Sequence, residues 1–181
     1  MSQKFGEMRQ IAFVVRDIDK AMKYWTQTLG VGPFFVKRHI EFANFIYRGA
    51  SAKSPIVSIA LANSGHLQIE LIQQHDETSS IYKEFLNSND EGLQHVSSWM
   101  THEGMKNRKR ELIAQGVKIA QECVIPSSGV NLLYFDTNSS GGGFIYEISD
   151  LLEPRHYERI HGIAKAAQDW NGQDPIREVR T

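Results

Sequence analysis

The sequence predicts an α+β fold in which two tandem βαβββ modules form a cupped sheet, followed by a helical C-terminal tail. Three observations predict it. Several segments are rich in β-branched and aromatic residues and are short enough for strands. An amphipathic helical pattern follows the first strand segment in each half. The order of patterns in the first half recurs in the second, which indicates an internal repeat of architecture.

The first module is expected over about residues 9–73. A strand over residues 9–16 is followed by Asp17, a residue typical of helix N-caps. Apolar residues then recur at spacings of three and four until Gly30, where the helix should end. The remaining strands of this module are expected over residues 34–47, 56–62 and 67–72.

The second module is expected over residues 93–149, after a polar linker over residues 74–92. Its first strand spans residues 93–100, and its helix begins after Thr101 and ends at Gly116. Three further strands are expected over residues 117–125, 130–136 and 144–149. One helix per module would cover one face of each sheet, so the uncovered faces can curl together and enclose a pocket.

Residues 1–150 are thus expected to form a single domain, and residues 151–181 a helical extension. Apolar residues lie along one helical stripe of this extension: Ile160, Ile163, Ala164 and Ala167. The stripe would pack on its own domain or on a second subunit, which would make the protein a homodimer. The sequence leaves open whether the tail closes the pocket or a dimer interface.

The composition is ordinary for a soluble globular protein, with 41% hydrophobic and 23% charged residues. The net charge is −1, so no broad basic field indicates a nucleic acid partner. The chain lacks an apolar run long enough to span a membrane, and its first residues lack the apolar core of a signal peptide. The single cysteine, Cys123, favours a reducing compartment, so we expect a cytoplasmic protein.

Glu70 is the most unusual residue in the predicted strands. Leu67, Ile69 and Leu71 share one face of their strand, while Gln68 and Glu70 share the other. A carboxylate in such apolar surroundings is costly unless something pairs with it. A metal ion is one candidate partner.

Other predicted strands supply matching polar residues. Glu147 lies on the last strand of the second half, as Glu70 lies on the last strand of the first. His95 and Gln10 lie on the two first strands. Gln10 precedes Glu70 by 60 residues, and His95 precedes Glu147 by 52. If they converge, these four residues give one nitrogen and several oxygens, a set that suits nickel, cobalt, manganese, iron or zinc.

Five short segments carry a resemblance to a known family: residues 10–17, 30–35, 67–71, 92–95 and 134–137. In order and spacing they resemble the vicinal oxygen chelate superfamily, especially its glyoxalase I and methylmalonyl-CoA epimerase-like branch. The resemblance covers residues 9 to about 150. It implies the glyoxalase/bleomycin-resistance/dioxygenase fold.

The resemblance also implies roles for individual residues. Carried over position by position, the metal ligands of glyoxalase I correspond to Gln10, Glu70, His95 and Glu147. A ligand glutamate also acts as the base in that enzyme, which implies Glu147 for proton transfer with Glu70 as its partner. Methylmalonyl-CoA epimerases more often have histidine at the first position, so Gln10 favours a glyoxalase-like set.

The expected function is that of a divalent-metal-dependent enzyme that transfers a proton next to a carbonyl group of a small metabolite, as an isomerase, epimerase or lyase. The alternative is a metal-free protein that sequesters a ligand, as bleomycin-resistance proteins do. An extradiol-type dioxygenase is disfavoured, because such iron sites generally need two histidines and one carboxylate.

The substrate is not identified by the sequence, and no glutathione-binding set of arginines can be matched. Residues that share a face with a predicted ligand, or lie on neighbouring strands, are the candidates for the pocket: Phe35, Phe45, Tyr47, Gln68, Ser97, Trp99 and Tyr134. For each aromatic residue, packing in the core is the competing interpretation.

Overall fold

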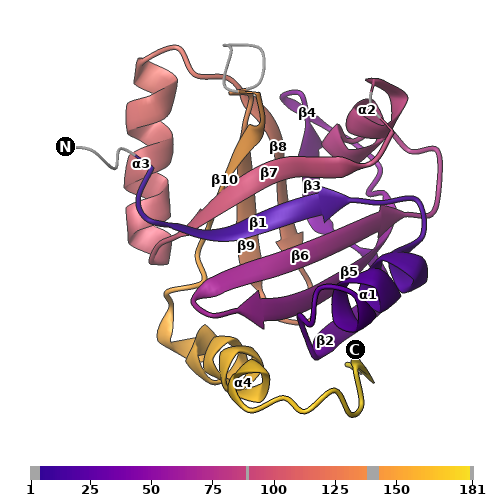
Figure 1. Cartoon of the computed structure of the whole chain (residues 1–181). Helices are drawn as coiled ribbons and strands as arrows, with labels where there is room; N and C mark the ends of the chain where they lie inside the picture. Colours follow the sequence, from indigo (N-terminus) through magenta and orange to yellow (C-terminus); the bar gives the residue numbers. More distant parts are fainter. Residues whose placement is uncertain (1–4, 89, 138–142, 180–181) are drawn as a thin grey trace.

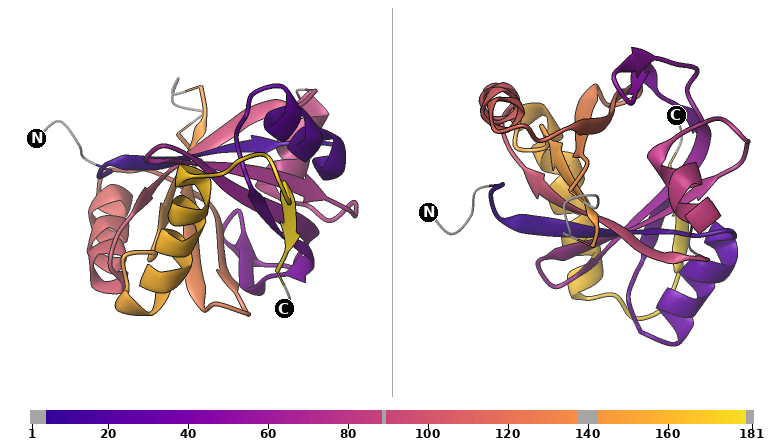
Figure 2. Two further views of the ribbon diagram at one scale, coloured as in Figure 1. Left: turned by 60° about the horizontal axis from the view of Figure 1, so that its bottom comes forward. Right: turned by 90° about the horizontal axis from the view of Figure 1, so that it is seen from above.

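The computed structural model describes residues 5–88, 90–137 and 143–179. Within these residues the strands form one continuous sheet of eleven strands. The sheet curves into a cup (Figures 1 and 2). This α+β architecture confirms the predicted fold class.

Four strands form the centre of the sheet. They are β1 (Met8–Val14), β6 (Leu67–Gln74), β7 (Gly92–Trp99) and β10 (Ile145–Ser149). Strand β1 pairs in parallel with β6 and antiparallel with β7, and β7 pairs in parallel with β10. The two halves therefore join through their first strands, and each half places its last strand beside its first.

The outer strands complete the two sides of the cup. On the first side lie β5 (Ile56–Ser64), β2 (Phe34–Glu41) and β11 (Ile176–Glu178). On the second side lie β9 (Val130–Phe135), β8 (Ile119–Ile125), β3 (Ala43–Tyr47) and β4 (Ala50–Ser51).

The strand predicted over residues 34–47 is two strands on opposite sides of the cup. Strand β2 stays in the first half, whereas β3 pairs antiparallel with β8 of the second half. The backbone departs from an extended conformation near the end of β2 and at the start of β3, with positive φ angles of 51° at His39 and 50° at Asn44. Because such angles interrupt an extended chain, they explain why one long strand does not form.

The two predicted helices cover the outer face of the sheet. Helix α1 (Ile18–Gln27) is capped by Asp17, whose side chain accepts a hydrogen bond from the backbone of Lys20. Helix α3 (His102–Ala114) is capped by Thr101 in the same way. Their buried residues pack on two separate clusters of apolar side chains, one under each helix. The concave face is left free for a third cluster and a cavity.

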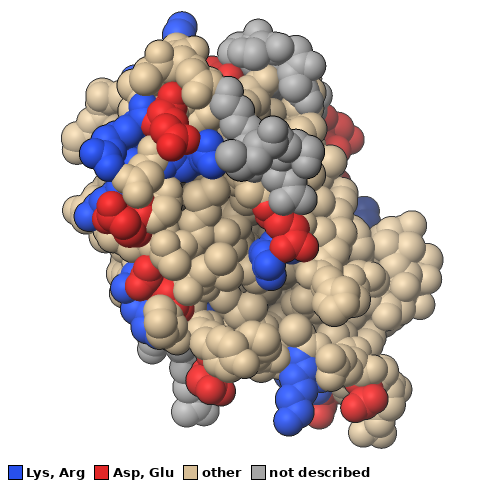
Figure 3. Space-filling model, turned by 90° about the vertical axis from the view of Figure 1, so that its left-hand side faces the viewer, with Lys and Arg blue, Asp and Glu red and all other residues tan. Residues whose placement is uncertain are grey.

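Charged side chains of both signs are mixed on the face of the molecule shown in Figure 3. On α3 the side chain of Arg108 pairs with Glu111 at 2.7 Å, and Lys109 pairs with Glu122 of β8. These two basic side chains of α3 therefore lie on a solvated helix face and have acidic partners. No helix among the described residues is both long and apolar enough to cross a membrane.

Two elements of the structure are additional to the predicted helices and strands. Helix α2 (Ile81–Ser88) lies in the stretch expected to be a linker. The tail is only partly helical: after a short 3-10 turn (Pro154–His156) and α4 (Tyr157–Gln168), β11 pairs in parallel with β2. The tail therefore contains a helix, as the sequence predicts, and also a strand, β11, that the sequence analysis did not include. Side chains of α4 line the cavity, so this helix packs on its own chain.

Candidate metal centre

The strand register brings Glu70, His95 and Glu147 together. Ala12 on β1 pairs with Glu70 on one side and with His95 on the other. Ser97, two residues beyond His95, pairs with Glu147. Side chains at paired positions point to the same face of a sheet. The small side chain of Ala12 leaves room for its two neighbours to approach each other.

These three residues each offer one ligand atom, and the three atoms lie within 4.8 Å of one another. Nε2 of His95 lies 3.4 Å from Oε2 of Glu70 and 3.4 Å from Oε2 of Glu147. His95 is fully buried, and Glu70 and Glu147 are only 8% and 2% exposed. Nε2 of His95 nevertheless has no hydrogen-bond partner. Two buried carboxylates beside an unpartnered nitrogen are costly unless a cation or a proton lies between them.

The other ring nitrogen of His95 is held by Gln94. Nδ1 lies 2.6 Å from Oε1 of Gln94, an amide oxygen that can only accept a hydrogen bond. Nδ1 therefore carries the proton, and in the neutral ring Nε2 presents its lone pair to Glu70 and Glu147. Histidines that bind metals are commonly oriented by such a partner. Gln94 was not among the predicted site residues, although a polar residue directly before His95 in a buried strand was a usable signal.

The three ionisable groups influence each other strongly. Burial alone would lower the pKa of His95, but the carboxylates of Glu147 and Glu70 outweigh it and raise this pKa to about 9. Burial raises the pKa of Glu70 above its usual value despite the nearby His95. Burial also acts to raise the pKa of Glu147, but His95 and a 2.6 Å hydrogen bond from Ser97 lower it overall. The two carboxylates are therefore not equivalent.

Gln10, the fourth predicted ligand, lies on the same face but outside this group of three. It pairs in register with Gln68 on β6 and with Ser97 on β7, and its Nε2 donates a 2.8 Å hydrogen bond to Oε1 of Gln68. This bond uses the amide nitrogen, which leaves the carbonyl oxygen as the atom that could bind a metal. A ligand role for Gln10 stays a prediction.

The residues present fit a divalent metal ion. One imidazole nitrogen and two carboxylates are common ligands of divalent ions, and two negative charges balance the charge of such an ion. The unpartnered Nε2 of His95 is the observation that decides the fit.

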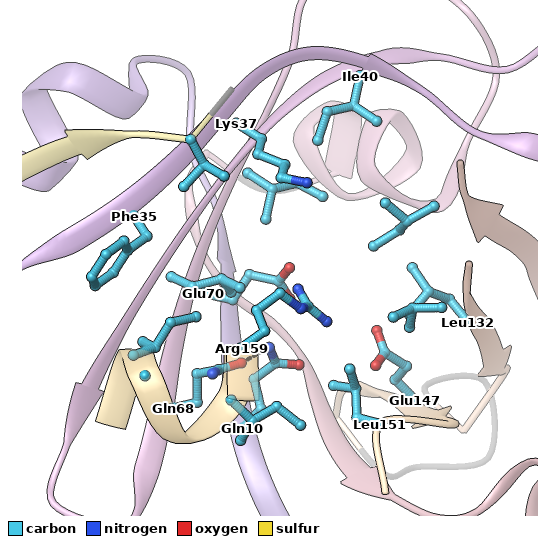
Figure 4. A pocket seen from close by; sticks show the side chains of 18 of the residues that line it. Gln10, Phe35, Lys37, Ile40, Gln68, Glu70, Leu132, Glu147, Leu151 and Arg159 are labelled. Atoms are coloured by element: carbon cyan, nitrogen blue, oxygen red, sulfur yellow. Dashed lines mark hydrogen bonds between the residues drawn. The ribbon is translucent and has the colours of Figure 1, made fainter. Parts of the chain in front are cut away.

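A cavity of about 360 Å³ opens beside this group (Figure 4). Gln10, Glu70 and Glu147 form part of its wall, and of the predicted pocket residues Phe35 and Gln68 also line it. The rest of the lining is largely apolar and comes from β2, β5, β8, β9, the loop after β10 and α4.

Five predicted pocket residues lie elsewhere. Phe45 packs on Phe42 in the core, at 6.3 Å between ring centroids. The hydroxyl of Tyr47 bonds to Glu84 of α2, and the ring of Trp99 lies under Arg9.

Ser97 and Tyr134 are placed behind the candidate ligands. Ser97 bonds Glu147, and Tyr134 contacts the ring of His95 edge-on and bonds Tyr82 at 3.0 Å. Alternation of faces along a strand places Ser97 on the face of His95, but it could not show which side chains reach the cavity.

The comparisons with known proteins agree with this architecture. Residues 9–134 match the family described as the Glyoxalase/Bleomycin resistance protein/Dioxygenase superfamily. A search of curated proteins found no match.

Three solved structures share the fold. A hypothetical protein from Bacillus halodurans C-125 is 19% identical, with a TM-score of 0.56 over 79% of this chain and 92% of that one. Methylmalonyl-CoA epimerase from Mycobacterium tuberculosis is 20% identical, with a TM-score of 0.55 over 78% and 85% of the two chains.

The third is a variant of Streptomyces coelicolor methylmalonyl-CoA epimerase in complex with 2-nitronate-propionyl-CoA. It is 14% identical, with a TM-score of 0.54 over 80% of this chain and 94% of that one. The family match covers most of the chain and the fold agrees with it. This chain belongs to the Glyoxalase/Bleomycin resistance protein/Dioxygenase superfamily, whose members are also called vicinal oxygen chelate proteins.

Proposed function

We propose that this protein is a divalent-metal-dependent enzyme that moves a proton at a carbon atom next to a carbonyl group of a small metabolite. The observation that carries the proposal is the buried, unpartnered Nε2 of His95 between Glu70 and Glu147 beside the cavity. Membership of a superfamily that includes such enzymes supports it.

Glu70, His95 and Glu147 would hold the metal ion, with Gln10 as a fourth ligand. A bound divalent ion supplies Lewis acidity, which lowers the energy of the negative charge that develops on a carbonyl oxygen. The protein contributes orientation through Gln94 and a largely apolar cavity that limits access of water.

The difference in pKa between the two carboxylates suits two different roles in proton transfer. The pKa of Glu147 is lowered, so this residue is ionised and ready to accept a proton from substrate. In the metal-free protein burial raises the pKa of Glu70, so of the two carboxylates this one holds a proton more readily before a metal ion binds. Pairs of acids whose surroundings separate their pKa values commonly divide the roles of base and acid. Epimerase, isomerase and lyase reactions of this kind all begin with the same proton removal.

Solvent exchange tests the proposal. Metal-loaded protein in deuterium oxide would be incubated with acyl-CoA thioesters, 2-hydroxyketones and hemithioacetals, and deuterium next to the carbonyl measured by mass spectrometry. We expect incorporation with at least one class, and a loss of about 10²- to 10⁴-fold in rate for Glu147→Gln. The matched control is Glu122→Gln, which removes a carboxylate paired with Lys109 on the outside of the cup. Absence of exchange with all three classes would contradict the proposal.

The apolar lining of the cavity also favours a second candidate, a metal-free protein that sequesters a ligand. This candidate predicts ligand binding that survives chelation and His95→Gln. The dioxygenase alternative stays disfavoured, because the group of three described ligands contains one histidine rather than two. Oxygen uptake with catechols and ferrous iron would reverse that judgement.

A further inference from the structure

Arg159 is a cation on the wall of the cavity, and its side chain is only partly exposed to solvent. It is the third residue of α4, and its side chain points into the cavity in front of the candidate metal centre (Figure 4). Its Nε is buried and has no hydrogen-bond partner. Among the described residues, no carboxylate forms an ion pair with its guanidinium, although the charge of Glu70 acts on it. A partly buried charge without a carboxylate partner is costly, so this arginine is suited to binding an anionic ligand.

A second cation faces the same space. Lys37 on β2 also lines the cavity, and its Nζ donates a 2.8 Å hydrogen bond to the hydroxyl of Ser127. Burial and the charge of Arg159 both lower the pKa of Lys37, as expected for two cations that share one space. A hydroxyl does not neutralise the ammonium group of Lys37, so within residues 5–88, 90–137 and 143–179 neither cation forms an ion pair with a carboxylate.

The carboxylates that line the same cavity have other partners or face solvent. Glu70 and Glu147 each lie 3.4 Å from Nε2 of His95, and among the described residues neither forms an ion pair with Arg159 or Lys37. Glu158, the remaining acid in the lining, is exposed to solvent. The rest of the wall beside Arg159 is apolar and includes Leu61, Leu132 and Ile163. The cavity therefore combines a cationic side with an apolar body.

We propose that Arg159, assisted by Lys37, binds the carboxylate of an amphiphilic acid whose apolar part fills the cavity. The guanidinium matches a carboxylate through two parallel hydrogen bonds. Binding there would place the acid against Glu70 and Glu147. The inference that this acid is a substrate rests on the proposed function, whereas the carboxylate site itself does not. Arg159 lies in α4, outside the matched residues 9–134, whereas Lys37 lies within them.

Calorimetric titration with matched probes tests the site. Octanoate, octanamide and octyl phosphate share an apolar chain and differ in the head group. We expect octanoate to bind at least tenfold more tightly than octanamide and more tightly than octyl phosphate. Arg159→Gln should abolish the preference for the acid while leaving the affinity for octanamide unchanged. Lys165→Gln, which removes an exposed positive charge from the same helix, is the control and should keep the preference.

Each titration would be run on chelator-treated and on metal-loaded protein. A preference that persists without metal and depends on Arg159 supports the carboxylate site even if no proton exchange is found. A preference that depends on metal and survives Arg159→Gln would overturn it. Equal binding of octanoate and octanamide, no binding of octanoate, or tighter binding of octyl phosphate would also overturn it.

Discussion

His95 is the residue around which the chemistry of the site is arranged. It is fully buried, its Nδ1 is held by Gln94, and its Nε2 faces two carboxylates at 3.4 Å. Sequence symmetry predicted the convergence of His95, Glu70 and Glu147, because strand alternation fixes which face each side chain occupies. It did not reveal Gln94, although this residue directly precedes His95. It did not reveal Arg159 either, because the place of this residue depends on how the tail packs on the cavity.

The first prediction at this scale concerns pH. The neighbouring carboxylates hold the pKa of His95 at about 9 in the metal-free protein. A metal ion binds only the neutral ring, so a proton has to leave His95 at any lower pH. We expect the apparent affinity for zinc or nickel to rise by roughly tenfold per pH unit between about pH 6 and 8.5. Competition with a coloured chelator measures this, and an affinity that is constant over this range would contradict it.

The second prediction concerns Gln94. Replacing it by leucine keeps the volume but removes the acceptor at 2.6 Å from Nδ1 of His95. We expect Gln94→Leu to bind metal about 10- to 100-fold more weakly, because loss of an orienting partner typically has this effect. Gln27→Leu, at the exposed end of α1, is the control and should bind metal like the unaltered protein. Unchanged metal affinity in Gln94→Leu would show that the hydrogen bond does not orient His95.

Among the elements, the tail contributes most to the cavity. Helix α4 lines the cavity, and the segment after it is fastened to the first half of the sheet. The ring of Trp170 packs on Gly32 so closely that a Cβ there would lie 2.8 Å from it. Strand β11 then pairs with β2, and Glu178 pairs with Arg38 at 2.8 Å.

Removing the ring of Trp170 should loosen this attachment. We expect Trp170→Ala to be cleaved several-fold faster by trypsin at Lys165, because the contact with Gly32 is lost while the sheet persists. Tyr157→Ala removes an aromatic ring that is 57% exposed at the start of α4, and its cleavage should be unchanged. Mass spectrometry of the fragments measures the rate. Equal cleavage of both variants would show that Trp170 does not hold the tail.

At the scale of the whole molecule, we propose that residues 1–150 form one domain. The two halves share a continuous sheet through the pairing of β1 with β7. We therefore expect the metal-free protein to unfold in urea in one transition, with circular dichroism and tryptophan fluorescence giving coincident curves. Two separated transitions would indicate that the halves unfold independently.

More of the fold than of the site could be predicted from the sequence. Helix caps at Asp17 and Thr101 and the repeated strand pattern gave the α+β class and both modules, because these signals are local in the chain. Strand β3 crosses to the other half and β11 joins β2, and neither pairing has a local signal. For the same reason the sequence indicated the carboxylates and His95 of the site but not which aromatic residues line the cavity.

The central claim is that Glu70, His95 and Glu147 hold a divalent metal ion. Metal analysis of protein purified from a medium that contains zinc, nickel, cobalt, manganese and iron tests it most directly. We predict about one divalent ion per chain, and less than a tenth of that in His95→Gln purified in the same way. Metal-free protein from such a medium, or equal metal content in His95→Gln, would contradict the account.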